Sequence, residues 1–376
     1  MKHYKRTLIV LLICCVQIQT VLAQKEEDIK WWNPAQSPFP VIEGQAWPNK
    51  VNYVYDRLPE YAKKKVREDI WDLSRNSAGL SIRFKTDASR ILVRYKVTGS
   101  LSMPHMPATG VSGVDLYSKN STEKWLWHKG KYSFGKTINY RFVNLPNDST
   151  IDYQDIEFQL YLPLYNTVER LEIGVPKNNK FEFLPISIKK PVVVYGTSIA
   201  QGACASRTGM AWTAILQRKM DMPVVNLGFS GNGELEEELI GLIAEIDAEV
   251  YVLDCFPNLI PGKEFSLSEV YKRIINSVKT LRQKRPKISV LLVEHAGYGD
   301  AATNKNRNKP VLALNKIAKK AFADLKAIGI ENIYLLTKDE IGLNTDSYVD
   351  GTHPSDYGML QYASAYEKSI REILNE

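Results

Sequence analysis

Residues able to carry out nucleophilic acyl transfer lie in two loops of the second half of the chain. Ser198 follows the apolar run Val192–Tyr195 in "VVVYGTSIAQG" and is itself followed mostly by small residues. Asp350 and His353 lie three positions apart in "VDGTHP". Serine is a poor nucleophile unless a base takes its proton, and a carboxylate can hold one imidazole nitrogen while the other faces the serine. We therefore predict a triad in the chain order Ser198, Asp350, His353.

Two further loops offer hydrogen-bond donors for a negatively charged oxygen. The loop "NLGFSGNGELE" contains glycines whose N–H groups could be open to an anion. The loop "LDCFPNL" places the amide of Asn258 after the fixed turn of Pro257. Backbone N–H groups and a side-chain amide are the usual parts of an oxyanion hole. The loops together therefore supply the different parts of a single reaction.

Each feature also has a simpler interpretation when it is taken alone. A serine after a strand is commonly a capping or turn residue, and a glycine-rich loop can be a plain turn or a phosphate-binding loop. His295, next to Glu294 after an apolar run, is a rival to His353 as the base. His105 and His128 lie in the first half, where an exposed or hydrogen-bonded histidine is the simpler interpretation.

The elements that must position these residues divide the chain into two domains. Residues 24–187 contain short alternating segments such as "LSIRFKT" and "TINYRFVNLP", separated by Gly, Pro, Asn and Asp. This pattern predicts a β-sandwich, jelly-roll-like domain, with one helix near Ala62–Leu73. Residues 188–376 alternate strand and helix patterns, which predicts an α/β domain with a parallel sheet covered on both faces. Its predicted strands are Val192–Tyr195, Val224–Leu227, Val250–Leu253, Ser289–Val293 and Ile333–Leu336, and its predicted helices are Ala211–Lys219, Leu235–Ala244, Leu267–Arg282, Pro310–Ile328 and Asp356–Leu374.

The first residues have the pattern of an export signal. "MKHYKRTLIVLLICCVQIQTVLAQ" combines a basic start, a short apolar run and small residues before Gln24, as secretory signals do. We predict a signal peptide over residues 1–23 and an exported protein, periplasmic or secreted, with no stable membrane insertion after cleavage. An uncleaved anchor and a lipoprotein modified at Cys14 or Cys15 are the alternatives.

The charge of the mature chain bears on its partners. Residues 1–23 hold Lys2, Lys5 and Arg6 and no acid, so cleavage lowers the formal net charge from +7 to +4. So small a charge, without a long basic run, argues against a nucleic-acid partner. A small-molecule or glycan ester remains the predicted partner, and the oligomeric state is left open.

Cys204 and Cys255 remain after cleavage of the predicted signal. An exported protein with one possible cysteine pair could carry one disulfide. Such a bond would join the loop after Ser198 to the loop that carries Asn258. Two buried free thiols are the alternative.

The motifs together resemble the SGNH/GDSL hydrolase superfamily. "YGTSIAQG" resembles its first block, with Ser198 as nucleophile, and "VLDCFPN" resembles its third block, with Asn258 in the oxyanion hole. "NLGFSGNG" resembles the second block, in which Gly231, or in a less favoured register Gly228, donates its N–H. "DGTHP" resembles the block that carries the aspartate and the histidine, here Asp350 and His353.

The resemblance extends to the first domain. The segment Gly113–Tyr117 reads Gly-Val-Asp-Leu-Tyr, which is similar to the GxDLY signature of a subgroup with a small amino-terminal domain. Thr197 stands where the superfamily commonly has Asp, and Pro257 where it commonly has Gly; both are similar to the subgroup. The resemblance therefore covers both domains.

The resemblance implies a three-layer α/β/α, flavodoxin-like hydrolase domain that cleaves esters through an acyl-serine, with no metal and no cofactor. The aromatic residues of the first domain favour a carbohydrate substrate, and we predict removal of short acyl groups, above all acetyl. A lysophospholipase, a thioesterase and a carbohydrate-binding protein without activity are the alternatives. Candidate substrate-binding residues are His105, Asp115, Gly228 and Asn232; the simpler interpretation is that Asp115 caps a turn and His105 lies at the surface.

Overall fold

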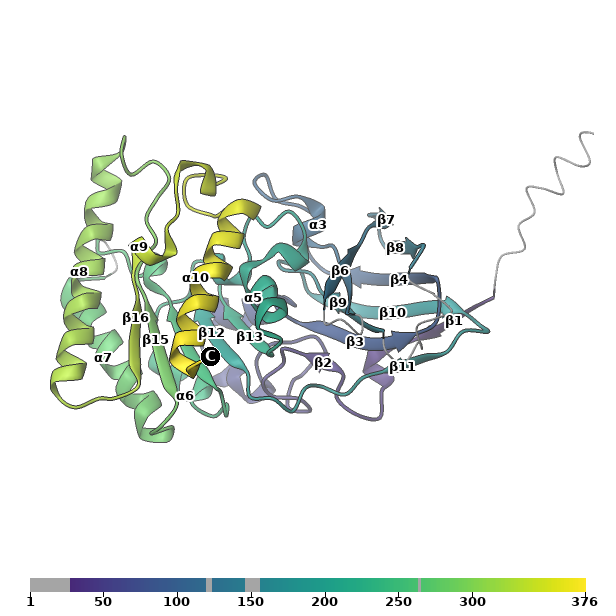
Figure 1. Ribbon diagram of the computed structural model, residues 1–376, viewed down its shortest axis with the longest axis horizontal. Coiled ribbons are helices and arrows are strands. Elements are labelled where there is room, and N and C mark those ends of the chain that lie inside the picture. The colour runs from purple at the N-terminus through teal and green to yellow at the C-terminus, as the bar shows by residue number, and fades with distance from the viewer. Residues whose placement is uncertain (1–27, 120–123, 146–155, 263–264) are drawn as a thin grey trace, which may run out of the picture.

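The computed structural model describes residues 28–119, 124–145, 156–262 and 265–376. The predicted signal peptide therefore lies outside the described residues. Figure 1 shows a β-rich domain on the right and a domain of helices around a sheet on the left. No helix in the described ranges is long and apolar enough to cross a membrane.

The first domain is an antiparallel β-sandwich, as the alternating segments predict. One sheet has the order β1 (Ile29–Trp32), β10 (Val168–Pro176), β4 (Arg90–Val97), β8 (Ile138–Val143) and β7 (Gly130–Ser133). The other has the order β11 (Phe181–Phe183), β3 (Ser81–Thr86), β9 (Glu157–Tyr161), β5 (Asp115–Lys119) and β6 (Trp125–His128), with β2 (Ile42–Glu43) paired to β3. Buried and exposed residues alternate along β8, because only one face of each sheet packs on the shared core.

The helix predicted near Ala62–Leu73 is wrong in its extent. The chain there forms a 3-10 helix, η2 (Glu60–Lys64), and a separate helix, α2 (Glu68–Ser74). Arg67 between them has an extended backbone, with φ −58° and ψ 149°, which ends one helical run and starts the next. Other short elements of this domain are η1 (Pro34–Gln36) and α3 (Ala108–Val111).

The second domain is built on a parallel sheet. Its strand order is β13 (Val224–Gly228), β12 (Val192–Gly196), β14 (Val250–Asp254), β15 (Ser289–Val293) and β16 (Ile333–Leu336). The chain order reverses between β13 and β14 around the first strand β12, which is the flavodoxin-like arrangement; ligands bind beyond the strand ends at such a point. Every residue of β12, β13 and β14 is buried, which explains their continuous apolar sequences.

Helices cover both faces of this sheet. The faces are separate apolar cores: one is closed by α6 (Glu237–Ile243), α7 (Leu267–Lys284) and α8 (Lys305–Ala327), the other by α5 (Trp212–Met220) and α10 (Asp356–Leu374). The three-layer α/β/α prediction is confirmed. Short elements at the strand ends are α4 (Ser198–Gln201), η4 (Thr208–Met210), η5 (Phe256–Asn258), α9 (Lys338–Ile341) and η6 (Thr345–Ser347).

The last residue of β14, Asp254, is a buried carboxyl group whose ionisation depends on folding. Burial raises its pKa to about 7, and a hydrogen bond with Tyr366 offsets only part of this rise. The unfolded value is about 3.9. The folded state therefore binds a proton that the unfolded chain releases between these values, and stability falls as pH rises through this range.

Asp254→Asn removes this titration with little change in shape. We expect the gain in melting temperature over the wild type to be larger at about pH 8 than at about pH 5, because only the wild type must bury a charge at the higher pH. Calorimetry of both proteins at both pH values measures the difference. An equal change at both would contradict a raised pKa at Asp254.

Candidate active site

Ser198 lies at the sharp turn from β12 into α4. Thr197 caps this short helix, with its hydroxyl oxygen accepting from the N–H of Ile199, and Gly202 ends it in the left-handed region at φ 107°. Ser198 is half-buried, and its Oγ lies 2.9 Å from Nε2 of His353. As the first residue of α4, Ser198 has an N–H that no residue of the helix can accept. The turn thus presents both a hydroxyl and a backbone donor at the end of the central strand.

His353 is held by Asp350. The ring Nδ1 lies 2.7 Å from Oδ2 of Asp350, while Oδ1 accepts the backbone N–H groups of His353 at 2.8 Å and Thr352 at 3.0 Å. Burial alone would raise the pKa of Asp350, but these hydrogen bonds outweigh it and lower the pKa to about 2. Asp350 is therefore ionised at neutral pH, which favours the tautomer with its proton on Nδ1 and leaves Nε2 to accept from Ser198. The structure brings the three predicted residues together.

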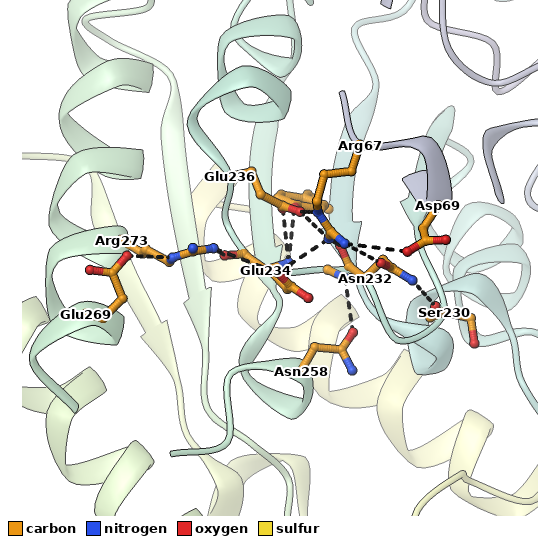
Figure 2. Close-up of polar contacts among 11 residues, drawn as sticks. Arg67, Asp69, Ser230, Asn232, Glu234, Glu236, Asn258, Glu269 and Arg273 are labelled. Carbon is orange, nitrogen blue, oxygen red and sulfur yellow. Dashed lines mark hydrogen bonds and ion pairs between the residues drawn. The ribbon is translucent and has the colours of Figure 1, made fainter. Parts of the chain in front are cut away.

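The predicted oxyanion donors are arranged around the glycine loop. Oδ1 of Asn258 accepts the N–H of Gly233 at 3.1 Å, so its Nδ2 points away from that contact (Figure 2). Gly231 is exposed, has φ 72°, and its N–H has no hydrogen-bond partner among the described residues. The N–H of Gly228 instead donates to Oδ1 of Asn226 at 2.9 Å. This occupied donor favours Gly231 over Gly228 in the oxyanion hole.

Asn258→Ala is expected to lower kcat about 10²–10³-fold, since one donor to a developing oxyanion contributes about that much. KM should change little, because the donor acts mainly on the transition state. Steady-state kinetics on an activated ester measure both constants. Asn276→Ala, on the exposed face of α7, is the matched control, and an equal kcat in the two variants would contradict the assignment.

A buried glutamine that the sequence did not single out ties the nucleophile helix to the glycine loop. Oε1 of Gln201 accepts the N–H of Ser230 at 2.9 Å. Its Nε2 donates to the carbonyl of Leu164 at 3.2 Å and to Oδ1 of Asn76 at 3.1 Å. Gln201 thus fixes the glycine loop to α4, and it fixes α4 to the first domain.

Arg57, from the first domain, supports the same glycine loop. The sequence did not single it out either. It is 1% exposed and donates to the carbonyls of Asn226 at 3.1 Å and Gly228 at 2.8 Å through Nη1. Its other donors reach the carbonyls of Asn76 at 2.8 Å and Leu73 at 2.7 Å. Burial lowers the pKa of Arg57 to about 9, so it is still a cation at neutral pH. Its hydrogen-bond partners among the described residues are backbone carbonyls and not acidic side chains, so Arg57 holds the backbone in place.

Arg67 holds the outer side of the glycine loop (Figure 2). It donates to Oδ1 of Asn232 at 2.7 Å and to Glu236 at 3.0 Å, and it lies 3.4 Å from the carboxylate of Glu234. The amide of Asn232 also donates to the carbonyl of Ser230 at 2.9 Å. One end of the Asn232 side chain is thus held by Arg67 and the other bonds within the loop, which fits a supporting role better than the predicted contact with substrate.

Asp115 of the GxDLY signature joins the two domains. It is 4% exposed, and its Oδ2 accepts from Arg207 and from the N–H of Gly209 at 3.1 Å. Its Oδ1 accepts from Nε1 of Trp127 at 2.6 Å. Tyr117 accepts from Arg207 at 2.6 Å. Asp115 therefore forms an interdomain ion pair with Arg207 rather than a simple turn cap. Because its carboxylate oxygens are used within the protein, these contacts favour a structural role over the predicted contact with substrate.

Further contacts between the domains lead to the loop that carries His353. The hydroxyl of Thr109 donates to the carbonyl of Ser206 at 2.6 Å. Ser206 in turn donates its N–H and its hydroxyl to Asp356, at 2.9 and 2.5 Å. Asp356 opens α10 three residues after His353. The first domain thus contributes to the position of the base.

The other described histidines differ from one another in burial and in their neighbours. His295 is 1% exposed, and burial lowers its pKa to about 3, so it is shut off from solvent and unsuited to be the base. His128 contacts the hydroxyl of Ser118 at 2.8 Å, and burial lowers its pKa to about 4. His105 is exposed, and its ring stacks on that of His353 with centroids 5.8 Å apart. Only His105, of these, lies beside the triad.

Of the two alternatives left open for the cysteines, the structure has the second: Cys204 and Cys255 are buried free thiols. Sγ of Cys255 lies 3.5 Å from the carbonyl of Tyr195 inside the core. The Cys204 thiol lies instead near Asp350, whose charge adds to burial in raising the thiol pKa to about 12. The two side chains are directed to different surroundings.

Comparison with known proteins agrees with this architecture. A family model for GDSL-like lipase/acylhydrolases matches residues 189–371, and a model for the GxDLY N-terminus of SGNH-hydrolase-type esterases matches residues 29–181. A crystal structure from Bacteroides ovatus ATCC 8483, described as a GDSL-like lipase, is 30% identical, with a TM-score of 0.83, over 93% of this chain and 98% of that chain. None of the curated proteins matches.

Two more distant structures share the fold. The salicylyl-acyltransferase SsfX3 from a tetracycline biosynthetic pathway is 17% identical, with a TM-score of 0.71 over 92% of this chain and 97% of that chain. An acetyl xylan esterase from the rumen bacterium Butyrivibrio proteoclasticus is 10% identical, with a TM-score of 0.54 over 92% of this chain and 99% of that chain. The likeness to the Bacteroides protein and the two family models identify the chain as a member of the GDSL-like lipase/acylhydrolase family that carries a GxDLY amino-terminal domain.

Proposed function

We propose that the protein is a serine esterase that removes short acyl groups, above all acetyl, from a carbohydrate. The observation that carries the proposal is the continuous contact from Ser198 through His353 to Asp350, at 2.9 and 2.7 Å. Ser198 attacks the ester carbonyl while Nε2 of His353 takes its proton. Asp350 stabilises the imidazolium that forms.

The oxyanion is held by the N–H groups of Ser198 and Gly231 and by Nδ2 of Asn258. His353 then gives its proton to the leaving alcohol, which leaves an acyl-serine. A water molecule, deprotonated by the same histidine, releases the acid and restores Ser198. The chain's own residues provide the nucleophile, the base and the oxyanion donors for both half-reactions.

The surface of the first domain supports a carbohydrate as the alcohol part. Trp127 and Tyr132 are 47% and 56% exposed, and exposed aromatic rings have apolar faces on which other rings can pack. The guanidinium of Arg207 lies over the Trp127 ring, 4.5 Å from its centroid. This contact belongs to the interdomain contacts that lead toward the loop of His353. A fold shared with an acetyl xylan esterase is consistent with this substrate. The same proposal includes export: the protein would act outside the cytoplasm, where it meets glycans.

The test is the release of acid from a panel of substrates. We expect acetate release from acetylated polysaccharides, and rates on p-nitrophenyl esters that fall steeply as the acyl chain lengthens. Rates that rise with chain length would favour the lysophospholipase or thioesterase alternative. Binding to glycans without turnover of any ester would favour a carbohydrate-binding protein.

A further inference from the structure

Four potential metal ligands meet beside the triad. His105, Cys204, Asp350 and His353 each place one ligand atom so that all four atoms lie within 4.8 Å of one another. They come from three separate segments and from both domains. The serine mechanism uses Asp350 and His353 but has no task for the other two.

The two additional residues are held at this place by the backbone. Cys204 is 5% exposed and adopts φ 69°, a left-handed conformation that costs energy for a residue other than glycine and often marks a functional constraint. His105 lies in a tight turn closed by mutual backbone hydrogen bonds of Met103 and Met106, at 3.0 and 3.1 Å. The turn carries the exposed imidazole to the ring of His353.

The set suits a cation that prefers sulfur and nitrogen. Two imidazoles, one thiolate and one carboxylate form a four-ligand set of the types that bind Zn²⁺, at bond lengths of about 2.0–2.3 Å. Ligand atoms in such a tetrahedron lie about 3.3–3.6 Å apart, as these bond lengths require. The observed limit of 4.8 Å exceeds this spacing by about an ångström, so binding requires the side chains to move together by about that distance.

We propose that Zn²⁺ or a similar thiophilic divalent cation binds to His105, Cys204, Asp350 and His353 and reversibly inhibits the enzyme. The thiol of Cys204 gives its proton to solvent. Nδ1 of His353 binds the cation, so the one proton of the neutral ring moves to Nε2. Nε2 then has no lone pair with which to accept the proton of Ser198, and attack on the ester stops. The cation also ties the first domain to the second through His105.

The first test measures cobalt binding in Ser198→Ala, so that it does not depend on esterase activity. We expect added CoCl₂ to give a thiolate-to-cobalt charge-transfer absorption at one equivalent, which Zn²⁺ displaces. The band should be lost in the double variant with Cys204→Ala. It should be kept with Cys255→Ala, which removes the other buried thiol. Zn²⁺ should raise the melting temperature of Ser198→Ala, because it binds only the folded state.

The second test measures inhibition and rests on the proposed function. We expect ZnCl₂ to inhibit the wild type, EDTA to restore activity, and the inhibition constant to rise at least tenfold in Cys204→Ala and in His105→Ala but not in Cys255→Ala. An absent charge-transfer band would overturn the proposal, as would equal inhibition constants in all variants. A protein that binds Co²⁺ through Cys204 yet hydrolyses no ester would refute the proposed function and leave the metal site standing.

Discussion

Ser198→Ala is expected to lower kcat on a short-chain ester by about 10⁶-fold, the size of loss seen when a serine nucleophile is removed from a triad. The physical reason is that no other described hydroxyl contacts His353, so there is no nucleophile that the base can activate. The fold should be retained, because the hydrogen bond of the Ser198 Oγ within the described residues is the one with that histidine. Steady-state kinetics of a highly purified sample that shows no pre-steady-state burst measure kcat. A thermal melt of the same protein shows whether the fold is retained.

Two further variants separate chemistry from damage to the fold. Asp350→Asn should lose about 10⁴-fold in kcat, because the amide favours the wrong tautomer of His353. Ser268→Ala, at an exposed position of α7, should match the wild type. Activity within tenfold of wild type in pure Ser198→Ala would refute the acyl-serine mechanism.

Arg57→Met should lower both the stability of the protein and its turnover. The change leaves four backbone carbonyls without their guanidinium donor, and a buried unsatisfied group costs about 1–3 kcal/mol. With four such groups, we expect the free energy of unfolding to fall by at least about 3 kcal/mol. The loop that carries Gly231 would also lose its support, and a displacement of about an ångström can cost about 10²-fold in rate.

The measurement must distinguish a displaced loop from simple unfolding. Denaturant titration gives the stability, and kcat is taken at a temperature where the variant is fully folded. Arg57→Lys keeps the charge but not the fork of donors, so it should retain more stability than Arg57→Met and still show a reduced kcat with KM nearly unchanged. Arg67→Met, on the half-exposed side of the same loop, should have a smaller effect on both. Wild-type kcat in a folded Arg57→Lys would contradict the positioning role.

The sequence predicted the parallel sheet well, since its strands are continuous apolar runs whose burial on both faces leaves few alternatives. Each predicted strand of that sheet lies within one residue of the observed one. The final helix, Asp356–Leu374, has the predicted bounds, because Ser355 caps it and its apolar face repeats with helical spacing. The short strands β1, β2, β5, β7 and β11 were not among the predicted segments.

The triad was predictable because its residues sit in recognisable loops, whereas the supports of the oxyanion loop were not. Arg57 acts on carbonyls 169 and 171 positions away, and its partners are backbone atoms that carry no residue signature. Gln201 did not stand out in the sequence because it lies among the mostly small residues after Ser198. Its side chain nevertheless joins three segments. The sequence left a disulfide and two free thiols open for Cys204 and Cys255, because it does not show where each thiol points.

Covalent labelling tests the central claim most directly. The purified protein is treated with a p-nitrophenyl phosphonate ester, which a serine nucleophile attacks to give a stable adduct, and the modified residue is located by peptide mass spectrometry. The account predicts one equivalent of adduct, on Ser198, with loss of esterase activity in proportion to labelling and no adduct in Ser198→Ala. An adduct on another residue, or full activity after Ser198 is labelled, would contradict it.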